Sequence, residues 1–178
     1  MELKETRVSR QCVYDGRLLH VYSDTVRLPD GRTAGREVLE HQGAVCVVPL
    51  DQNGCVTLVR QYRYAVGREV LEIPAGKIDA GEEPFAAAIR ELSEETGQAA
   101  GSWTDLGEYL PTPGYSGEVL RCYLATELTE GESHTDPDEF LRTETMSLKE
   151  AVALVMDGTI SDGKSAFALL KAARLLGI

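Results

Sequence analysis

Alternation of apolar and polar residues predicts strands over the first quarter of the chain. Such patterns occupy residues 7–14 and 17–28, and the turn signal LPDGR at 28–32 leads to a returning strand at 37–41. These segments predict a small antiparallel sheet over roughly the first 40 residues.

The middle of the chain carries longer apolar runs. AVCVVPL at 44–50 and CVTLVRQY at 55–62 flank DQNG, whose Asn53-Gly54 pair predicts a hairpin. Later strands are predicted at 106–110, 119–126 and 140–146. Three helices follow from periodicity and end signals, at 84–97, 147–158 and 162–176. Interspersed strands and helices predict an α/β or α+β sandwich.

The first predicted helix has two faces. At about 100° per residue, one side carries Phe85, Ile89 and Leu92, which we expect to face the core. Beside it lie three carboxylates, those of Glu91, Glu94 and Glu95. Like charges so close weaken a helix, and Arg90 offsets only part of the repulsion. A hard divalent cation would explain the crowding, whereas a solvated helix face is the alternative.

Composition narrows the classes of function. A chain of 178 residues fits one domain, or one domain with a small appendage. The net charge of −11 argues against a nucleic-acid partner, because phosphate backbones need a basic face. No run approaches the roughly 20 apolar residues that span a bilayer, so no membrane partner is expected. The start resembles no signal peptide, and we expect a cytoplasmic protein.

The cysteines and histidines predict neither a disulfide nor a zinc centre. The four cysteines form no CxxC pair, and the three histidines are scattered. Three of the four cysteines, which are Cys12, Cys46, Cys55 and Cys122, lie within apolar runs, where Cys behaves as a small hydrophobic residue, so buried thiols are expected.

Residues 76–98 resemble the Nudix box, G-x5-E-x7-R-E-U-x-E-E-x-G-U, where U is a bulky apolar residue. The matching positions are Gly76, Glu82, Arg90, Glu91, Leu92, Glu94, Glu95 and Gly97. Gln98 departs from the pattern at the final U, which affects packing after the helix more than ligand chemistry.

This resemblance implies an α/β/α sandwich around a mixed sheet. Residues 43–178 would form the Nudix hydrolase domain, and residues 1–42 the antiparallel β-sheet appendage. It also implies Mg²⁺, or Mn²⁺ or another divalent cation, and attack of water on a phosphorus of a pyrophosphate.

The resemblance also assigns roles within the box. The leading metal ligands would be Glu91 and Glu95, with Glu94 as a ligand or helper. Arg90 would hold a box glutamate in place. Glu82 would be either an outer-shell ligand or a structural partner.

Segments outside the box are similar to bacterial ADP-ribose pyrophosphatases. They are GREVLEHQGAVCVVPL, RQYRYAVGREVLEIPAGKID, YLPTPGYSGE and ISDGKSAFALLKA. Pro113 follows the last box position by fifteen residues, as in that subfamily, although TPGYSG is also an ordinary turn sequence. The implied reaction converts ADP-ribose to AMP and ribose 5-phosphate.

The subfamily likeness adds candidate site residues. The backbone carbonyl of Ala75 would be a metal ligand. Contacts to the nucleotide or terminal ribose are expected from Arg36, Arg63 and Glu72, since arginine binds phosphate in two places and stacks on adenine. A surface salt bridge is the alternative role for Arg36.

The resemblance also implies an acidic residue from a loop in the active site and a homodimer. Within TDPDEF at 135–140, Glu139 is the chosen metal ligand or general base, and Asp136 or Asp138 could serve instead. In relatives the N-terminal sheet helps to build a homodimer, so a homodimer is expected here.

Two alternatives remain open at this point. The enzyme could act on another nucleotide sugar such as GDP-mannose, or on an oxidised nucleoside diphosphate. A domain that senses ADP-ribose without cleaving it is the alternative from another class, but such domains are expected to lose box acids. Glu91, Glu94 and Glu95 are all present.

Overall fold

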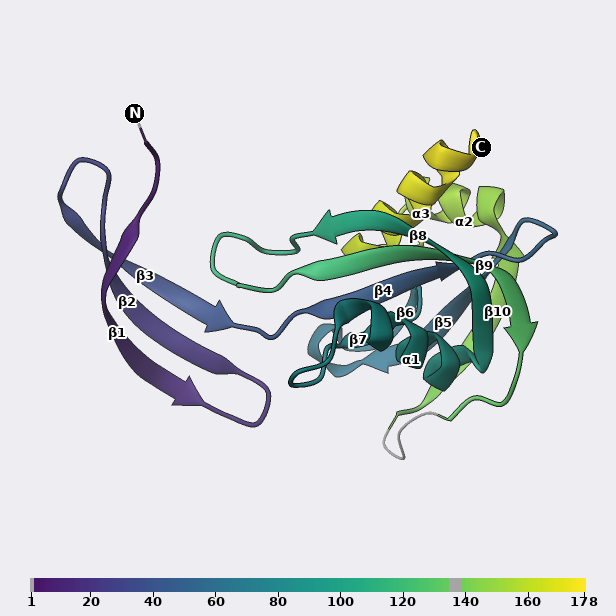
Figure 1. Cartoon of the computed structure of the whole chain (residues 1–178), viewed down its shortest axis with the longest axis horizontal. Helices are drawn as coiled ribbons and strands as arrows, with labels where there is room; N and C mark the ends of the chain where they lie inside the picture. The colour runs from purple at the N-terminus through teal and green to yellow at the C-terminus, as the bar shows by residue number, and fades with distance from the viewer. Residues whose placement is uncertain (1, 135–138) are drawn as a thin grey trace. The chain divides into compact units, whose positions relative to one another are not determined.

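The computed structural model describes residues 2–134 and 139–178 (Figure 1). The described residues fall into two compact units. The first holds the chain up to Gly43 together with 110–119, and the second holds 44–109 and the chain from 120 onward. Within the described ranges, no helix is both long and apolar enough to cross a membrane.

The first unit contains the antiparallel sheet predicted from the sequence. Its strands, in the order β1-β2-β3, are Thr6–Asp15, His20–Arg27 and Thr33–Glu40. The predicted turn before β3 forms, with Gly31 in the left-handed region at φ 87°. The segment 110–119 joins this unit through Leu39 of β3, whose backbone bonds to Tyr115 and Gly117.

The second unit is built on two sheets. A mixed sheet has the order β7-β4-β9-β8, with strands Ala75–Lys77, Ala44–Pro49, Leu120–Glu130 and Gln98–Tyr109. In it only the β4–β9 pair is parallel among the pairings of the described strands. An antiparallel sheet has the order β10-β5-β6, with strands Leu141–Ser147, Cys55–Arg63 and Arg68–Glu72. A short 3-10 helix, Tyr64–Val66, connects β5 to β6.

The sequence predicted that the strands on either side of DQNG pair as a hairpin, and this prediction is wrong. The turn itself forms, with Gly54 at φ 78° and the Asp51 carboxylate accepting from backbone N–H groups. However, β4 and β5 enter different sheets and share only an isolated bridge between Leu50 and Val56. The reason is that β4 already has β7 and β9 as neighbours, which leaves it no edge for β5.

The three predicted helices are present, with α1 at Pro84–Thr96, α2 at Leu148–Met156 and α3 at Gly163–Leu176. The residues predicted to begin and end these helices do so in the structure. Pro84 occupies the start of α1, and Gly97 ends it at φ 72°. The side chains of Ser147 and Asp162 cap α2 and α3 by accepting backbone hydrogen bonds.

Helices cover both faces of the mixed sheet, which gives the Nudix α/β/α sandwich (Figure 1). Alternate residues of β4 point to opposite faces. Val45 and Val47 belong to the cluster that includes α1, whereas Cys46 and Val48 belong to the larger cluster that includes α2 and α3. The central strand is therefore buried on both sides, which holds the adjoining β7 and α1 in a fixed relation.

The expected core face of α1 is partly wrong. Leu92 is buried, but Phe85 and Ile89 are each 44% exposed. The buried face instead carries Ala87 and Ala88, whose small side chains let the helix approach the sheet closely. Rotation of the helix about its axis also places Glu95 on the buried side.

The four cysteines are free thiols, as predicted, but their burial differs from the prediction. Cys46 and Cys122 are buried and face each other across the parallel β4–β9 pair, with their Sγ atoms 3.1 Å apart. Cys55 is half-buried and Cys12 is exposed. Cys12 lies on the edge strand β1, where almost every residue faces solvent.

Candidate active site

The site begins where the short strand β7 runs beneath α1. β7 pairs with β4 through Ala75 and Gly76, and α1 packs on both strands. A Cβ atom at Gly76 would lie 1.9 Å from an oxygen of Glu91. Glycine at this position is therefore required for the Glu91 carboxylate to lie against the strand.

Glu95 is a buried carboxyl group with incomplete hydrogen bonding. It is 1% exposed, and its Oε2 accepts a hydrogen bond of 3.0 Å from the backbone N–H of Ala75. Its Oε1 is buried and has no hydrogen-bond partner among the described residues. Burial raises the pKa of Glu95 to about 8, and the charges of Glu139 and Glu91 add to this effect. A cation bound at Oε1 would give this oxygen a partner and would favour the ionised form of the carboxyl group.

Glu91 lies one helical turn before Glu95 and is also largely buried. Burial raises its pKa above the usual range, although the hydrogen bond from Arg90 works against this shift. The negative charges of Glu94 and Glu139 raise the pKa further. Mutual repulsion of this kind disfavours the ionised carboxylates, and a bound cation would relieve it.

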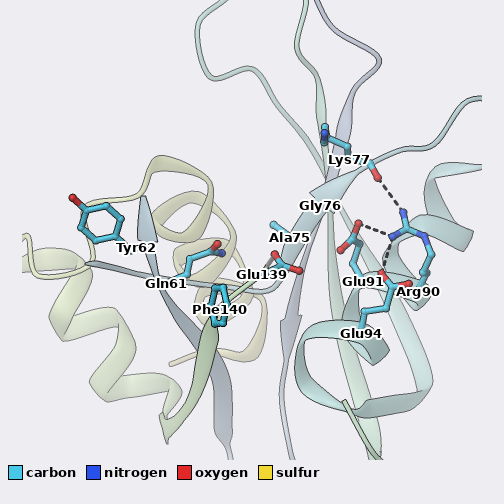
Figure 2. Close-up of a pocket in the computed structure, with 10 residues that line it drawn as sticks. All are labelled: Gln61, Tyr62, Ala75, Gly76, Lys77, Arg90, Glu91, Glu94, Glu139 and Phe140. Atoms are coloured by element: carbon cyan, nitrogen blue, oxygen red, sulfur yellow. Dashed lines mark hydrogen bonds and ion pairs between the residues drawn. The ribbon is translucent and has the colours of Figure 1, made fainter. Parts of the chain in front are cut away.

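Arg90 holds three box glutamates at once. Its Nε and Nη2 donate to Glu82 at 3.0 Å each, and its Nη1 donates to Glu91 at 2.8 Å and to Glu94 at 2.9 Å. Nη2 also donates to the carbonyl oxygen of Lys77 on β7 (Figure 2). The hydrogen bonds from Arg90 lower the pKa of Glu82 to about 2. In this structure Glu82 is thus a structural partner of Arg90.

A cavity of about 520 Å³ opens beside these acids. Figure 2 shows Glu91 and Glu139 directed into the same space next to Ala75, from α1 and from the segment before β10. Gln61 and Phe140 line the other side of the cavity. The alternative loop acids, Asp136 and Asp138, lie outside the described residues.

The donors present fit a hard divalent cation. In the described part of the chain, no group of three or more His, Cys, Asp or Glu side chains forms a metal cluster. Two carboxylates nevertheless lie against β7, that of Glu91 at Gly76 and that of Glu95 at the backbone N–H of Ala75. Mg²⁺ commonly binds one or two carboxylates and completes its shell with water and phosphate oxygens.

A second buried carboxylate, Glu72 at the end of β6, has the opposite environment. Arg63 of β5 donates to it from Nε at 2.7 Å and from Nη2 at 2.8 Å, and Lys164 of α3 donates from Nζ. Asp162 accepts from Lys164 at 3.0 Å. Burial raises the pKa of Glu72, but Arg63 and Lys164 outweigh burial and lower the pKa below its usual value.

This network lines a cavity of about 410 Å³ and includes residues that the sequence did not single out. Arg63 and Glu72 were expected to bind substrate, and the structure brings them together. Lys164 and Asp162 join this network although the sequence analysis assigned neither of them to the site. Their signal was the sequence ISDGKS, where an acid and a cation flank a glycine at a helix start.

Two further predicted residues, Arg36 and Pro113, belong to the first unit. Arg36 donates from Nε to Glu5 at 3.0 Å, which is the surface salt bridge considered as its alternative role. Pro113 is exposed in a turn, where the carbonyl oxygen of Thr112 accepts from the backbone of Tyr115 and Ser116.

The sandwich, together with a glutamate-rich helix that follows a glycine-containing loop, defines a class of hydrolases that cleave pyrophosphate bonds. A family model described as the NUDIX domain matches residues 40–167. A second, described as the nucleoside diphosphate sugar hydrolase N-terminal domain, matches residues 5–39. The chain therefore belongs to the Nudix family and is a Nudix hydrolase of the nucleoside diphosphate sugar type.

The chain is also similar to individual proteins over most of its length. The chain is 36% identical to an ADP-ribose pyrophosphatase of Bacillus subtilis, over 94% of this chain and 91% of that protein. It is 33% identical to a methanol dehydrogenase activator of Bacillus methanolicus, over 93% and 91% of the two chains. A crystal structure of an ADP compounds hydrolase matches 99% of this chain and 97% of that one, with a TM-score of 0.86 and 26% identity.

Proposed function

We propose that the protein is a Mg²⁺-dependent ADP-ribose pyrophosphatase that yields AMP and ribose 5-phosphate. The observation that carries the metal-dependent part is Glu95, a buried carboxyl group with one oxygen lacking a partner among the described residues. The similarity to the ADP-ribose pyrophosphatase of Bacillus subtilis supports the choice of ADP-ribose among nucleoside diphosphate sugars.

In the proposed reaction, the oxygen of water attacks one phosphorus of the pyrophosphate. The bridging P–O bond breaks, and the departing phosphate takes its electron pair. Glu91, Glu95 and the carbonyl oxygen of Ala75 would hold the cation, which neutralises phosphate charge and lowers the pKa of water when bound. Glu139, which lines the same cavity, accepts the proton of the attacking water at a carboxylate oxygen.

Other residues position these groups and the substrate. Arg90 fixes the orientation of Glu91 and Glu94, and Glu94 assists the metal ligands. Arg63 binds substrate phosphate, because its planar guanidinium suits two-point contacts with phosphate oxygens. By resemblance, substrate contacts are also assigned to Glu72, Arg36 and Pro113.

Residues 1–42 are proposed as an appendage that forms a homodimer, and residues 43–178 as the catalytic domain. The appendage leaves apolar side chains exposed, including Leu3, Val8, Val13, Tyr14, Leu18 and Leu19. Apolar surface of this kind is typical of an interface between copies. Light scattering at micromolar concentration is expected to give the mass of a dimer, and a monomer would contradict the proposal.

The function is tested by hydrolysis of a nucleotide panel with Mg²⁺. The panel comprises ADP-ribose, GDP-mannose, NADH, diadenosine polyphosphates and oxidised dGDP. We expect ADP-ribose to be cleaved fastest, with AMP and ribose 5-phosphate as products and no cleavage in EDTA. Faster cleavage of GDP-mannose would reassign the substrate. Binding of ADP-ribose without cleavage of any compound would favour the sensing alternative.

A further inference from the structure

The Glu72 carboxylate is held by two cations that come from different elements. Arg63 of β5 approaches through Nε and Nη2, and Lys164 of α3 approaches through Nζ. The side chain of Glu72 is 3% exposed, that of Lys164 is 12% exposed and that of Arg63 is 42% exposed. The network therefore extends from a buried carboxylate and ammonium to a guanidinium at the surface of the second cavity.

Lys164 also binds a second carboxylate, that of Asp162. Its ammonium group donates to Asp162 at 3.0 Å, and the Asp162 carboxylate caps α3 by accepting from the backbone of Ser165 at 2.9 Å. The Ser165 hydroxyl oxygen in turn accepts from the backbone N–H of Ile73, the residue after Glu72, at 2.9 Å. The end of β6 and the start of α3 are thus tied together at Glu72 and Ile73.

Stability alone does not account for this arrangement. A buried ion pair costs much desolvation, and well-packed apolar residues often replace it with no loss of stability. The arrangement does have a geometric result. The Arg63 guanidinium uses one edge on Glu72, and its outer edge carries further N–H donors at the cavity.

Charge balance makes Lys164 necessary for that result. Arg63 and Lys164 balance the two carboxylates of Glu72 and Asp162, and Arg68 adds a further positive charge to the cavity lining. Without Lys164, both carboxylates act on Arg63, since the charge of Asp162 already reaches it. The guanidinium would then be drawn inward, and the cavity would lose positive charge that attracts phosphate.

We propose that Lys164, seated on Asp162, is a positioning residue for substrate binding. It immobilises Glu72 so that Arg63 keeps its inner edge on Glu72 and its outer edge directed at substrate phosphate. The inference rests on the proposed role of Arg63 in the hydrolysis reaction. It assigns a role to Lys164, which lies 92 residues from Glu72 in the sequence.

The test compares Lys164→Met and Lys164→Arg with the matched control Lys171→Met, which removes an exposed cation from the same helix. KM and kcat for ADP-ribose are measured at saturating Mg²⁺. Lys164→Met is expected to raise KM roughly tenfold or more, with a smaller change in kcat. Lys164→Arg is expected to recover most of the affinity, and Lys171→Met to match the wild type.

A pH profile separates positioning from a merely structural role. Arg63 and Lys164 together lower the pKa of Glu72, and the other charged groups around this pair are Asp162, Arg68 and, acting on Arg63, Glu95. Removal of Lys164 lets the pKa of Glu72 rise, so Glu72 becomes protonated and releases Arg63 at a higher pH. The acid limb of kcat/KM is therefore expected to shift to higher pH in Lys164→Met alone.

Calorimetric titration with ADP-ribose in EDTA separates failure of this inference from failure of the proposed function. If the wild type cleaves ADP-ribose and Lys164→Met matches Lys171→Met in KM and pH profile, only the inference is overturned. If the wild type binds without cleavage, the proposed function fails, and weaker binding by Lys164→Met still supports the inference while equal binding overturns it. A wild type that neither binds nor cleaves ADP-ribose overturns both.

Thermal melting shows whether each variant is folded. Should Lys164→Met unfold, the double variant Glu72→Gln/Lys164→Met removes both charges and restores the balance within the core. Its KM is expected to remain raised, because Arg63 has lost its anchor. A folded double variant with the KM of the wild type would overturn the inference.

Discussion

Glu95 and Glu72 are both buried glutamates, 1% and 2% exposed, yet their surroundings are opposite. Glu95 faces other carboxylates, keeps one oxygen without a partner among the described residues, and has a pKa raised to about 8. Glu72 is bound by Arg63 and Lys164, which lower its pKa. Burial alone therefore does not decide the charge state of a carboxyl group, because the partners supplied by neighbouring elements decide it.

The short segment 72–75 connects the two glutamates: it begins with Glu72 and ends at Ala75, which is bonded to Glu95. Glu72 precedes Ile73, whose N–H is held from α3, and Glu95 accepts from the N–H of Ala75. In the proposed function the segment connects a cavity whose lining carboxylates outnumber its cations with one whose lining cations outnumber its carboxylates. The first suits a cation and the second suits substrate phosphate.

The largest effect is expected from Glu95→Gln, which removes the unsatisfied carboxylate. Turnover of ADP-ribose should fall by about a thousandfold or more, equivalent to about 4 kcal/mol, because the cation loses a charged ligand. Steady-state kinetics at several Mg²⁺ concentrations measure this loss. Glu83→Gln, at the exposed start of the same helix, is the control and should retain full activity.

Glu72→Gln is expected to lower stability in addition to weakening substrate binding. It leaves Arg63 and Lys164 without their shared counter-charge in a buried position, which typically costs about 3–5 kcal/mol. Urea unfolding of the metal-free protein measures this loss. A stability change as small as that of an ordinary surface substitution would show that the network contributes little.

Glu139→Gln should cut kcat by about a hundredfold and leave KM nearly unchanged, because a general base acts on the attacking water and not on the bound nucleotide. Its position in the cavity beside Glu91 motivates the prediction. Unchanged turnover would remove Glu139 from the mechanism.

A smaller effect is expected from Gly76→Ala. The added methyl group would displace the Glu91 carboxylate from β7, so kcat/KM should fall by about tenfold and the Mg²⁺ requirement should rise. Gly35→Ala is the matched control, since a Cβ atom there meets no atom within 4 Å. Equal kinetics for the two variants would mean that Glu91 does not depend on its contact with the strand.

The smallest effect concerns stability and pH. The pKa of Glu95 is about 8 in the folded chain and 4.5 as its ordinary value, so between these values the unfolded chain releases a proton that the folded chain keeps. The metal-free wild type therefore loses stability as pH rises through this window. Glu95→Gln should be more stable than the wild type at the alkaline end of the window, and its stability should show no such slope. Thermal melts in EDTA across this range provide the comparison, and parallel curves would contradict it.

Local sequence signals predicted the helix that carries the acids. The spacing from Gly76 to Gly97 identified the box, and Pro84 and Gly97 fixed the ends of α1. The cap residues Ser147 and Asp162 were equally informative, because a cap depends on residues within one turn.

Features that depend on distant segments were predicted poorly. The Asn53-Gly54 turn was correct, but the partners of β4 were not, because other strands had taken both of its edges. The rotation of α1 depended on how closely Ala87 and Ala88 approach β4. The contact between Glu72 and Lys164 joins residues too distant in sequence for any local pattern to reveal.

The most direct test of the central claim is a calorimetric titration of the metal-free protein with Mg²⁺ at pH 7, in buffers of different ionisation enthalpy. Because Glu95 keeps a proton below its pKa of about 8, binding at this site should release that proton, and the apparent enthalpy should vary with the buffer. Glu95→Gln should bind more weakly and lose the buffer dependence. Equal affinity in wild type and variant, with no proton released, would show that the cation does not bind at Glu95.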